Sequence, residues 1–514
     1  MTLHKSGKLI TSICTGVALT VAAQTWAGGF LGGLFEVWGP RYTYTGDAAS
    51  QLRWTQPPPP ICGNAANSVR RCNHVAMDAN AIDHTPPAPG ESRVFGEQVG
   101  PARTSRAFAI IHIAIFEAVN AIAGGFQSYT GLGPAGPDTS MEAAVAQAAH
   151  DTLAAMYPSQ TTRFDALLAE DLSVIPDGAA KENGIYVGQC AAAGILALRA
   201  GDGSDRPEPR IGIDFITSNQ PGKWRQDPIS QNPLALGAYW GAVRPLVLSS
   251  ASQFRVCAPP SLTSPSYTLA FNEVKLVGGD GMATPAVRTP DQTFEAIYWG
   301  YDGTPGLGTP PRLYNQIAVQ IAGQMGSDVV GLARMLALVN VALADAGIAC
   351  WESKYYFQFW RPIAGIRESD PGTGPTGAGD GNLFTLGDPN FTPLGAPASN
   401  LRGPNSTPPF PAYPSGHATF GGAIFQILRH VYGTDSIAFT FVSDEFNGMT
   451  RDNQGNVRPR MARSFSSLSQ AEEENGQSRI YLGIHWTFDK TAGITQGRRV
   501  ADFVFNNAFV PVSY

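Results

Sequence analysis

From residue 101 onward, apolar residues recur at helical spacing, and this periodicity constrains the fold more than any other feature. Four such patterns, each bounded by Gly, Pro or Ser, precede the middle of the chain: Arg103–Gly125, Ser140–Met156, Thr161–Ile175 and Ala179–Ala200. Further patterns follow at 265–276, 290–300, 312–325, 327–353, 418–431 and 494–507. They predict an all-α fold built from packed helices.

Two of these patterns resemble each other. Arg106–Ala118 can be laid over Arg334–Ala346, with Arg, three Ala positions and the pair Glu117/Asp345 matching. Duplication of a helical bundle would explain the match. Coincidence between two Ala-rich helices is the alternative, and the sequence leaves both open.

The segments between the helical patterns are rich in Pro and Gly. We predict that residues 28–100, which contain Pro57–Pro60 and Pro86-Pro87, form an irregular wrap over the core. Residues 101–260 would hold a first helical bundle and a Pro-rich connection, and residues 261–514 a second bundle. The Gly/Pro-rich coil at 370–412 is long enough to indicate a functional loop or a cover.

The N-terminus has the pattern of an export signal. Lys5 and Lys8 precede the apolar run Leu9–Ala23, and Thr25-Trp26-Ala27 is a plausible cleavage site. We therefore expect residues 1–27 to be a signal peptide and the protein to be periplasmic or secreted. An uncleaved anchor or an ordinary N-terminal helix is the alternative. We expect no later segment to be long and apolar enough to span a bilayer, so the mature form would not be a membrane protein.

Charge and cysteine content narrow the classes of partner. The formal net charge is −6, which gives no reason to expect nucleic acid as a partner, so any anion site must be a local positive pocket. Six cysteines are too few for a disulfide scaffold. If the protein is exported, Cys62 and Cys72 are the most plausible pair, whereas Cys190 and Cys350 are expected to be buried thiols.

Three short clusters near the C-terminus carry the chemistry. They read Lys354-x6-Arg361-Pro362, Pro414-Ser415-Gly416-His417 and Ser478-Arg479-x5-His485. Arg presents a fork of donors, Lys a point charge, and amides at a helix start point along the helix dipole. One imidazole can bond to a central atom while the other moves protons. Each cluster alone is common, but together they predict a site for a tetrahedral oxyanion.

The clusters and their surroundings resemble the chloroperoxidase branch of the vanadium-dependent haloperoxidases. The likeness is strongest over residues 290–490 and extends to four further segments: Ile297–Gly303, Gly308–Arg312, Pro408–Pro414 and Gly483–Trp486. That family shares its oxyanion pocket with type 2 phosphatidic acid phosphatases and bacterial class A acid phosphatases. The resemblance implies two four-helix bundles with long connecting loops, and vanadate at the end of the second bundle.

The resemblance also implies a role for each site residue. His485 would bond vanadium, and His417 would contact the apical oxygen and act as the acid–base group. Asp302 would orient an arginine from behind. The vanadate oxygens would be held by one set of donors, namely Lys354, Arg361, Ser415, Gly416 and Arg479.

The implied reaction is Lewis-acid activation of hydrogen peroxide, which oxidises halide to hypohalous acid for a small organic acceptor. Lys354 would polarise the bound peroxide, and neither haem nor flavin is required. Trp351 and Phe410 match aromatic positions that shape an apolar halide site in the chloroperoxidase branch, whereas the bromoperoxidase branch carries His at the Phe410 position. We therefore predict oxidation of chloride, and also of bromide and iodide. Plain core packing is the alternative for both aromatic residues.

Two other functions are compatible with the oxyanion pocket. An acid phosphatase would use His485 as the phosphoryl-accepting nucleophile and His417 as the leaving-group acid. A non-catalytic oxyanion-binding protein would need no acid–base histidine. Asp302, Trp351 and Phe410 favour the peroxidase over the phosphatase, because they match the peroxidase branch.

Overall fold

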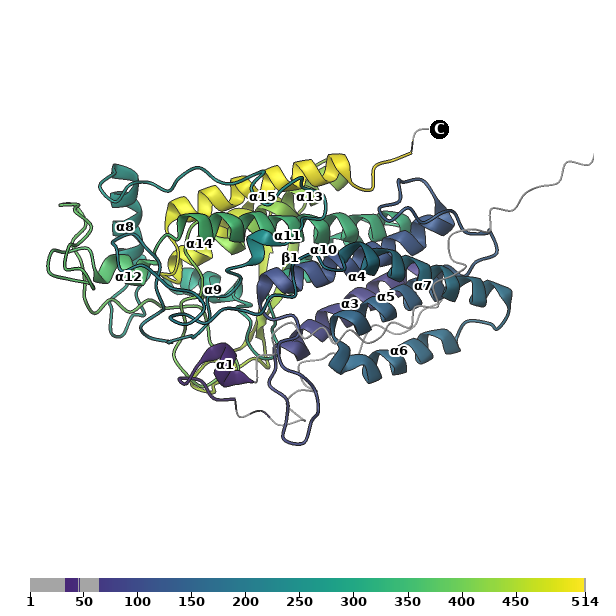
Figure 1. Ribbon diagram of the computed structural model, residues 1–514, viewed down its shortest axis with the longest axis horizontal. Helices are drawn as coiled ribbons and strands as arrows, with labels where there is room; N and C mark the ends of the chain where they lie inside the picture. Colours follow the sequence, from purple (N-terminus) through teal and green to yellow (C-terminus); the bar gives the residue numbers. More distant parts are fainter. Residues whose placement is uncertain (1–32, 45, 47–63, 513–514) are drawn as a thin grey trace, which may run out of the picture.

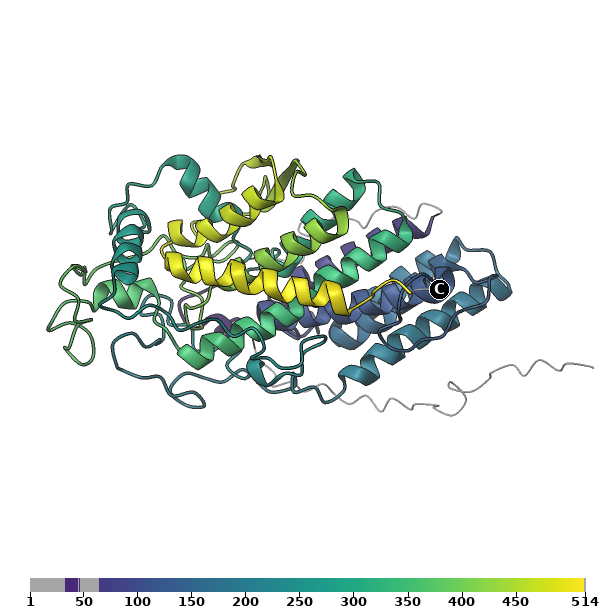
Figure 2. The same ribbon diagram turned by 90° about the horizontal axis from the view of Figure 1, so that it is seen from above.

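The computed structural model describes residues 33–44, 46 and 64–512, and it confirms the helix-rich fold (Figure 1). The longer helices run along the long axis of the molecule, and the Pro/Gly-rich coil gathers at the end opposite the first bundle (Figures 1 and 2). The signal peptide predicted at 1–27 and Cys62 lie outside the described residues. Cys72 and Cys350 are buried, and Cys190 is half-buried.

The first bundle contains one helix more than the four predicted. Its helices are α3 (Ala65–Asp83), α4 (Gly100–Ala123), α5 (Met141–Met156), α6 (Thr161–Ser173) and α7 (Ala179–Arg199). Helices α3, α4, α6 and α7 all pack against α5, although α6 buries only Phe164. A short 3₁₀ helix, η1 (Pro158–Gln160), joins α5 to α6.

The prediction of an irregular wrap over 28–100 was wrong for residues 65–83, which form α3. Its polar residues hid the helical pattern because many of them are buried, among them Arg71, Asn73 and Asp78. Asn73, for example, lies in the interior and pairs with the ring of His112 at 2.9 Å. The described residues before α3 include the five-residue helix α1 (Leu34–Trp38).

The second half of the chain follows the predicted helices closely and adds two that were not predicted separately. Its bundle contains α10 (Pro310–Gln324), α11 (Val329–Phe357), α13 (Gly416–Tyr432), α14 (Leu468–Tyr481) and α15 (Thr487–Asn507). Shorter elements lie around it, namely η2 (Trp240–Ala242), α8 (Pro265–Val277), α9 (Pro290–Tyr298) and α12 (Pro362–Arg367). The coil at 370–412 contains no helix.

An antiparallel hairpin, which the sequence did not predict, interrupts the helices. Its strands are β1 (Phe439–Asn447) and β2 (Arg460–Phe465). Glu445 of β1 is fully buried and accepts the backbone N–H of Tyr301 at 3.1 Å, while Ser399 and Arg458 donate to its other oxygen. The hairpin therefore supports the loop that follows α9, from which Asp302 projects.

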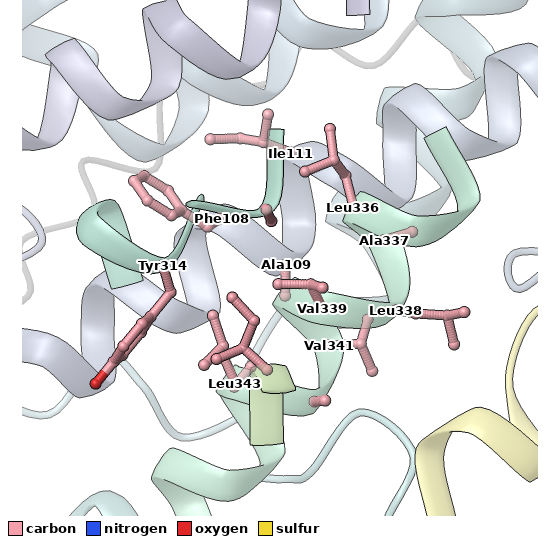
Figure 3. Close-up of a cluster of buried hydrophobic side chains, with 14 of the residues drawn as sticks. Phe108, Ala109, Ile111, Tyr314, Leu336, Ala337, Leu338, Val339, Val341 and Leu343 are labelled. Atoms are coloured by element: carbon pink, nitrogen blue, oxygen red, sulfur yellow. The ribbon is translucent and has the colours of Figure 1, made fainter. Parts of the chain in front are cut away.

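The two bundles share one continuous core. Helix α4 packs against α11, and their side chains interlock with those of α10, as Figure 3 shows for Phe108, Leu336 and Tyr314. By length and composition both α4 and α11 could span a bilayer, so the expectation that no such segment follows the N-terminus was wrong. Their apolar windows are 89% and 78% buried, however, so their place in the core accounts for their composition.

The two helices that resemble each other in sequence each carry a buried carboxylate that holds a neighbouring loop. Glu117 of α4 accepts hydrogen bonds from Ser128, Tyr129 and Thr130. Asp345 of α11 accepts the three consecutive backbone N–H groups of residues 246–248 at 2.7–2.9 Å. Each buried carboxylate thus holds a loop at the same position of its helix, which favours duplication over coincidence.

Helices α13 and α15 cross so closely that only glycine fits at the contact. A Cβ on Gly493 would lie 2.7 Å from the carbonyl oxygen of Ser415, and one on Gly422 would lie 2.5 Å from that of Ile494. A Cβ on Gly497 would overlap the carbonyl oxygen of Thr419. This crossing sets the position of the start of α13, where Ser415 and His417 lie.

We expect Gly497→Ala to lower the free energy of unfolding by about 1–3 kcal/mol, because the added methyl group pushes two helix backbones apart. The matched control is Gly323→Ala in α10, where a Cβ meets no atom within 4 Å. That change should leave stability unchanged or raise it by up to about 1 kcal/mol through helix propensity. Urea titrations of both variants measure the difference, and equal stabilities would contradict the close crossing.

Candidate active site

The three predicted clusters converge at one end of the second bundle. Lys354 lies in the last turn of α11, Arg361 directly before α12, and Ser415 at the N-cap of α13. The third cluster bridges two helices: Arg479 lies in the last turn of α14, and His485 in the turn before α15. All five side chains are buried.

Hydrogen bonds fix the tautomer of His485. Its Nδ1 lies 2.8 Å from Asp489 Oδ2, and its Nε2 lies 2.9 Å from Arg361 Nη1. A guanidinium can only donate, so Nε2 carries the lone pair and Nδ1–H donates to the carboxylate. Burial lowers the pKa of His485 well below its usual range, and the positive charge of Arg361 lowers it further. The ring is therefore neutral. A neutral imidazole with its lone pair among cations is suited to bond an electrophilic atom.

Both arginines have donors with no protein partner. Arg361 donates through Nε to Phe410 O and through Nη1 to Ile484 O, each at 2.9 Å, but buried Nη2 has no hydrogen-bond partner among the described residues. Arg479 donates through Nη2 to Asp302 Oδ1 at 2.7 Å, while its buried Nε and Nη1 have none. Buried donors are rarely left unpaired, so these three N–H groups point to an anionic ligand.

Lys354 contributes charge to the same pocket. Its Nζ donates to the carbonyls of Pro411 and Ala412, at 2.9 and 3.0 Å, and to that of Pro414. Burial lowers the pKa of Lys354 to about 7. Burial likewise lowers the pKa of Arg361 to about 9. Both shifts mean that the pocket disfavours unneutralised positive charge.

The start of α13 supplies the remaining donors. The Ser415 hydroxyl accepts the backbone N–H of Ala418 at 3.5 Å, which leaves its proton free to donate. The N–H groups of Gly416 and His417 are at the helix start, where no intrahelical acceptor exists. A Cβ on Gly416 would lie 3.2 Å from the ring of Trp351, so the indole packs directly against this backbone.

The ring of His417 is held by a loop carbonyl. Its Nε2 donates to Gly300 O at 2.8 Å, which leaves Nδ1 as the atom with the lone pair. Burial lowers the pKa of His417 well below its usual range, and the positive charge of Arg479 lowers it further. His417 is therefore a neutral acceptor until an anion in the pocket stabilises the protonated ring.

Asp302 lies beside Arg479 with one oxygen unused. Oδ1 accepts from Arg479, whereas buried Oδ2 has no partner among the described residues. Burial raises the pKa of Asp302, and Arg479 opposes that shift. The structure thus places Asp302 where the sequence predicted it, behind an arginine of the oxyanion site.

A small cavity of about 60 Å³ adjoins the oxyanion site, with Asp302 and Phe410 among its lining residues. The rings of Trp351 and Phe410 are 4.9 Å apart, and Lys354 Nζ lies 5.1 Å from the centroid of Phe410. Trp38 of α1 closes part of the cavity, so the N-terminal segment contributes to the site. Trp351 and Lys354 are not among its lining residues, and we call this cavity the halide chamber only because Phe410 was predicted to be a halide-site residue.

The donor set fits a tetrahedral oxyanion such as vanadate. Three orphaned guanidinium N–H groups, the amides at the start of α13 and the Ser415 hydroxyl surround an imidazole lone pair. Arg361, Arg479 and Lys354 supply the compensating charge. Every residue that the sequence assigned to the vanadate pocket therefore belongs to one buried cluster.

Known proteins resemble this chain in sequence and in fold. A family model described as VCPO second helical-bundle domain matches residues 334–512. Vanadium chloroperoxidase from Curvularia inaequalis is 32% identical over 511 aligned positions, covering 83% of this chain and 79% of that protein. The chain therefore belongs to the vanadium haloperoxidase family, whose members use vanadate as cofactor.

Solved structures of more distant relatives share the fold. A bacterial vanadium-dependent iodoperoxidase has a TM-score of 0.68 at 23% identity, with 89% of this chain and 99% of that chain covered. A bacterial vanadium-dependent chloroperoxidase in its apo form has a TM-score of 0.58 at 14% identity, with coverages of 80% and 96%. At these identities the likeness concerns the fold alone.

Two residues of the site were missed from the sequence. Asp489 lies four residues after His485, a spacing that would have suggested a carboxylate–imidazole pair at a helix start. Trp38 gave no signal, because nothing local connects residue 38 with the C-terminal clusters. Only the tertiary fold brings α1 to the halide chamber.

We expect Asp489→Asn to weaken orthovanadate binding about 10- to 100-fold, because the amide holds the reactive tautomer of His485 less well. Equilibrium dialysis measures the change without turnover. The matched control is Asp502→Asn, which alters another Asp–His pair of α15, formed with His430 at 2.7 Å. Equal vanadate affinities of the two variants would contradict the role of Asp489.

The pocket should bind anions less tightly as the pH rises. Anion binding needs protonated Lys354, whose pKa is about 7, so affinity is full below pH 7 and falls above it. Asp489, whose pKa burial raises to about 7, gains negative charge over the same range and acts in the same direction. Calorimetric titration with sulfate, which does not itself titrate near neutrality, should show a fall of up to about tenfold per pH unit for each proton.

The variant Lys354→Gln provides the control for that titration. It should bind sulfate more weakly at pH 6 than the unmodified protein does, and its affinity should change less between pH 6 and 8. Sulfate affinity that is independent of pH in the unmodified protein would contradict the assignment of Lys354 to the anion pocket.

Proposed function

We propose that this protein is a vanadate-dependent haloperoxidase that uses hydrogen peroxide to oxidise chloride, and also bromide and iodide, to hypohalous acid. Family membership supports halide oxidation. The observation that carries the proposal is the meeting, in one site, of buried donors without a partner among the described residues, an imidazole lone pair and the Trp351–Phe410 ring pair beside a small cavity. A phosphatase would need the donors and the imidazoles, but it has no use for the chamber.

Vanadate would be held by His485 through Nε2 and by the donors of Arg361, Arg479, Ser415 and Gly416. Bound vanadate supplies a Lewis acid that activates peroxide without changing its own oxidation state. For His485 to bond through Nε2, Arg361 Nη1 must give up its 2.9 Å contact with that atom and turn to an oxygen of the anion. Asp489 keeps the imidazole oriented throughout.

Proton movement falls to His417. Its free Nδ1 can accept a proton from incoming peroxide and return one to the departing product. Because its pKa is lowered, the His417 ring is unprotonated and can accept a proton, and a bound anion would raise that pKa by stabilising the imidazolium. Lys354 can polarise the reacting oxygen if one of its three carbonyl partners is exchanged for it.

Selection of chloride is attributed to Trp351 and Phe410. An apolar wall removes water from a small, strongly hydrated anion, while the charges of Lys354 and Arg361 offset the cost of that desolvation. Arg361 Cζ lies 5.0 Å from the centroid of Phe410, so cation and aromatic face are adjacent. Phe410 thus links the two features, because its ring lines the halide chamber and also lies next to the charges of Lys354 and Arg361.

The size of the halide chamber bears on the organic acceptor. A volume of about 60 Å³ holds a few water-sized species, whereas pockets for organic ligands are about 300–1,000 Å³. We therefore propose that small organic acceptors react with hypohalous acid outside the chamber. We further propose that the protein is exported and that its mature form is not a membrane protein, as the N-terminal pattern suggests.

The decisive assay uses metal-free protein with and without orthovanadate, and follows peroxide-dependent halogenation of a diketone dye. Vanadate-dependent turnover in chloride is the expected result. Turnover in bromide alone would show that the protein is a haloperoxidase but would contradict the proposed oxidation of chloride. Absence of turnover in either halide, together with phosphate-ester hydrolysis that vanadate inhibits, would make the protein an acid phosphatase with His485 as nucleophile.

We expect Phe410→His to reduce chloride turnover about tenfold or more relative to bromide turnover, since the polar ring retains water near the smaller halide. The ratio of kcat/KM values for the two halides measures this effect independently of enzyme loading. The control is Phe384→His, which changes a side chain that is 78% exposed in the coil. A ratio unchanged by Phe410→His would assign the ring to packing alone.

A further inference from the structure

A second and larger cavity lies on the molecule, with no lining residue in common with the halide chamber. It is open to solvent, has a volume of about 580 Å³, and lies between α8, the first half of α15 and the loop at 254–260. This volume is within the range of sites for small organic ligands. No part of the proposed reaction requires it.

The lining of this cavity is mainly apolar. Phe254, Val256, Leu269, Tyr413, Phe488 and Ala492 contribute side chains. Leu269 of α8 is 73% exposed, although it is a large apolar residue. The rings of Tyr413 and Phe488, with centroids 6.0 Å apart, belong to an aromatic cluster that continues through Trp486. An apolar body entering the cavity would therefore find a rigid aromatic surface.

The lining contains a cation, Arg499, whose guanidinium forms no ion pair with the described residues. Arg499 lies over the ring of Phe254 with Cζ 4.9 Å from its centroid, and no hydrogen bond or ion pair of its guanidinium occurs among residues 33–44, 46 and 64–512. The carboxylate in the lining, Glu273, accepts from the neutral donors Thr487 and Gln477; it keeps its negative charge but forms no ion pair with Arg499. The cavity thus presents one free positive group beside an apolar surface.

From this arrangement we propose that the cavity binds an aromatic monocarboxylate. The aromatic body would pack on Phe254, Tyr413 and Phe488, and the carboxylate would receive the donors of Arg499. A guanidinium already stacked on an aromatic ring loses little side-chain freedom on pairing, so its geometry is prepared for a planar anion. The size of the cavity accommodates one or two rings.

The site is separate from the oxyanion pocket but lies directly behind it. Tyr413 precedes Pro414, whose carbonyl accepts from Lys354, and Phe488 precedes Asp489, which orients His485. The occupant would therefore contact the rear of the oxyanion site without reaching the reacting atoms. The proposal concerns binding and does not depend on haloperoxidase activity.

The test measures binding of 2-naphthoate to the full-length chain by calorimetry, with sulfate in excess to occupy the oxyanion pocket. We expect one site per chain, and weaker binding of the neutral analogue 2-naphthol by about fivefold, as for loss of one partly exposed ion pair. Arg499→Gln should reduce naphthoate affinity to that of naphthol. Thr491→Trp, which adds bulk at an exposed position of the lining, should reduce binding of both probes at least tenfold.

The matched control is Arg206→Gln, which removes another exposed arginine that lies over an aromatic ring, that of Tyr239 at 5.8 Å. It should leave naphthoate binding unchanged. The proposal is overturned if naphthoate does not bind, if Arg499→Gln has no effect, or if naphthol binds as tightly as naphthoate. It is also overturned if Thr491→Trp alters the oligomeric state and leaves naphthoate binding intact, since the cavity would then be a contact between copies.

Discussion

The structure depends on the burial of three cationic side chains in one pocket of an acidic protein. Desolvation is unfavourable for each charge, and it lowers the pKa of Lys354 to about 7 and that of Arg361 to about 9. Asp302 and Asp489 compensate only in part, because they supply two carboxylates against three cations. An oxyanion would supply the missing charge and the missing acceptors together. Its binding should therefore stabilise the fold as well as equip the site.

The helices explain how these charges are held in place. The glycine contact between α13 and α15 positions the start of α13, whose helix dipole directs positive potential toward the pocket. The turn before α15 presents His485, and Asp489 in the first turn of α15 secures it. On the other side, the hairpin holds the loop of Asp302 and Gly300 through Glu445. The site thus depends on packing contacts made by segments far apart in the sequence.

Local patterns were sufficient to predict most helices and the members of the oxyanion pocket, because helical spacing and motif spacing are both short-range signals. Local patterns failed for the elements whose structure depends on contacts with distant parts of the chain. Helix α3 was missed because its buried polar residues, such as Asn73, find partners on other helices. The hairpin supports a loop more than a hundred residues away in sequence, and Trp38 reaches the halide chamber from the N-terminal segment. The roles of Trp351 and Phe410 came from a family resemblance, since their aromatic character alone is equally typical of core packing.

The three guanidinium nitrogens without a partner among the described residues and the lone pair of His485 would together form the vanadate site. The most direct measurement is a crystal structure of the protein grown with orthovanadate. The account predicts vanadium bonded to His485 Nε2, with its oxygens accepting from Arg361 Nη2 and from Arg479 Nε and Nη1. Vanadate bound elsewhere, or bound in the pocket without a bond to His485, would contradict it.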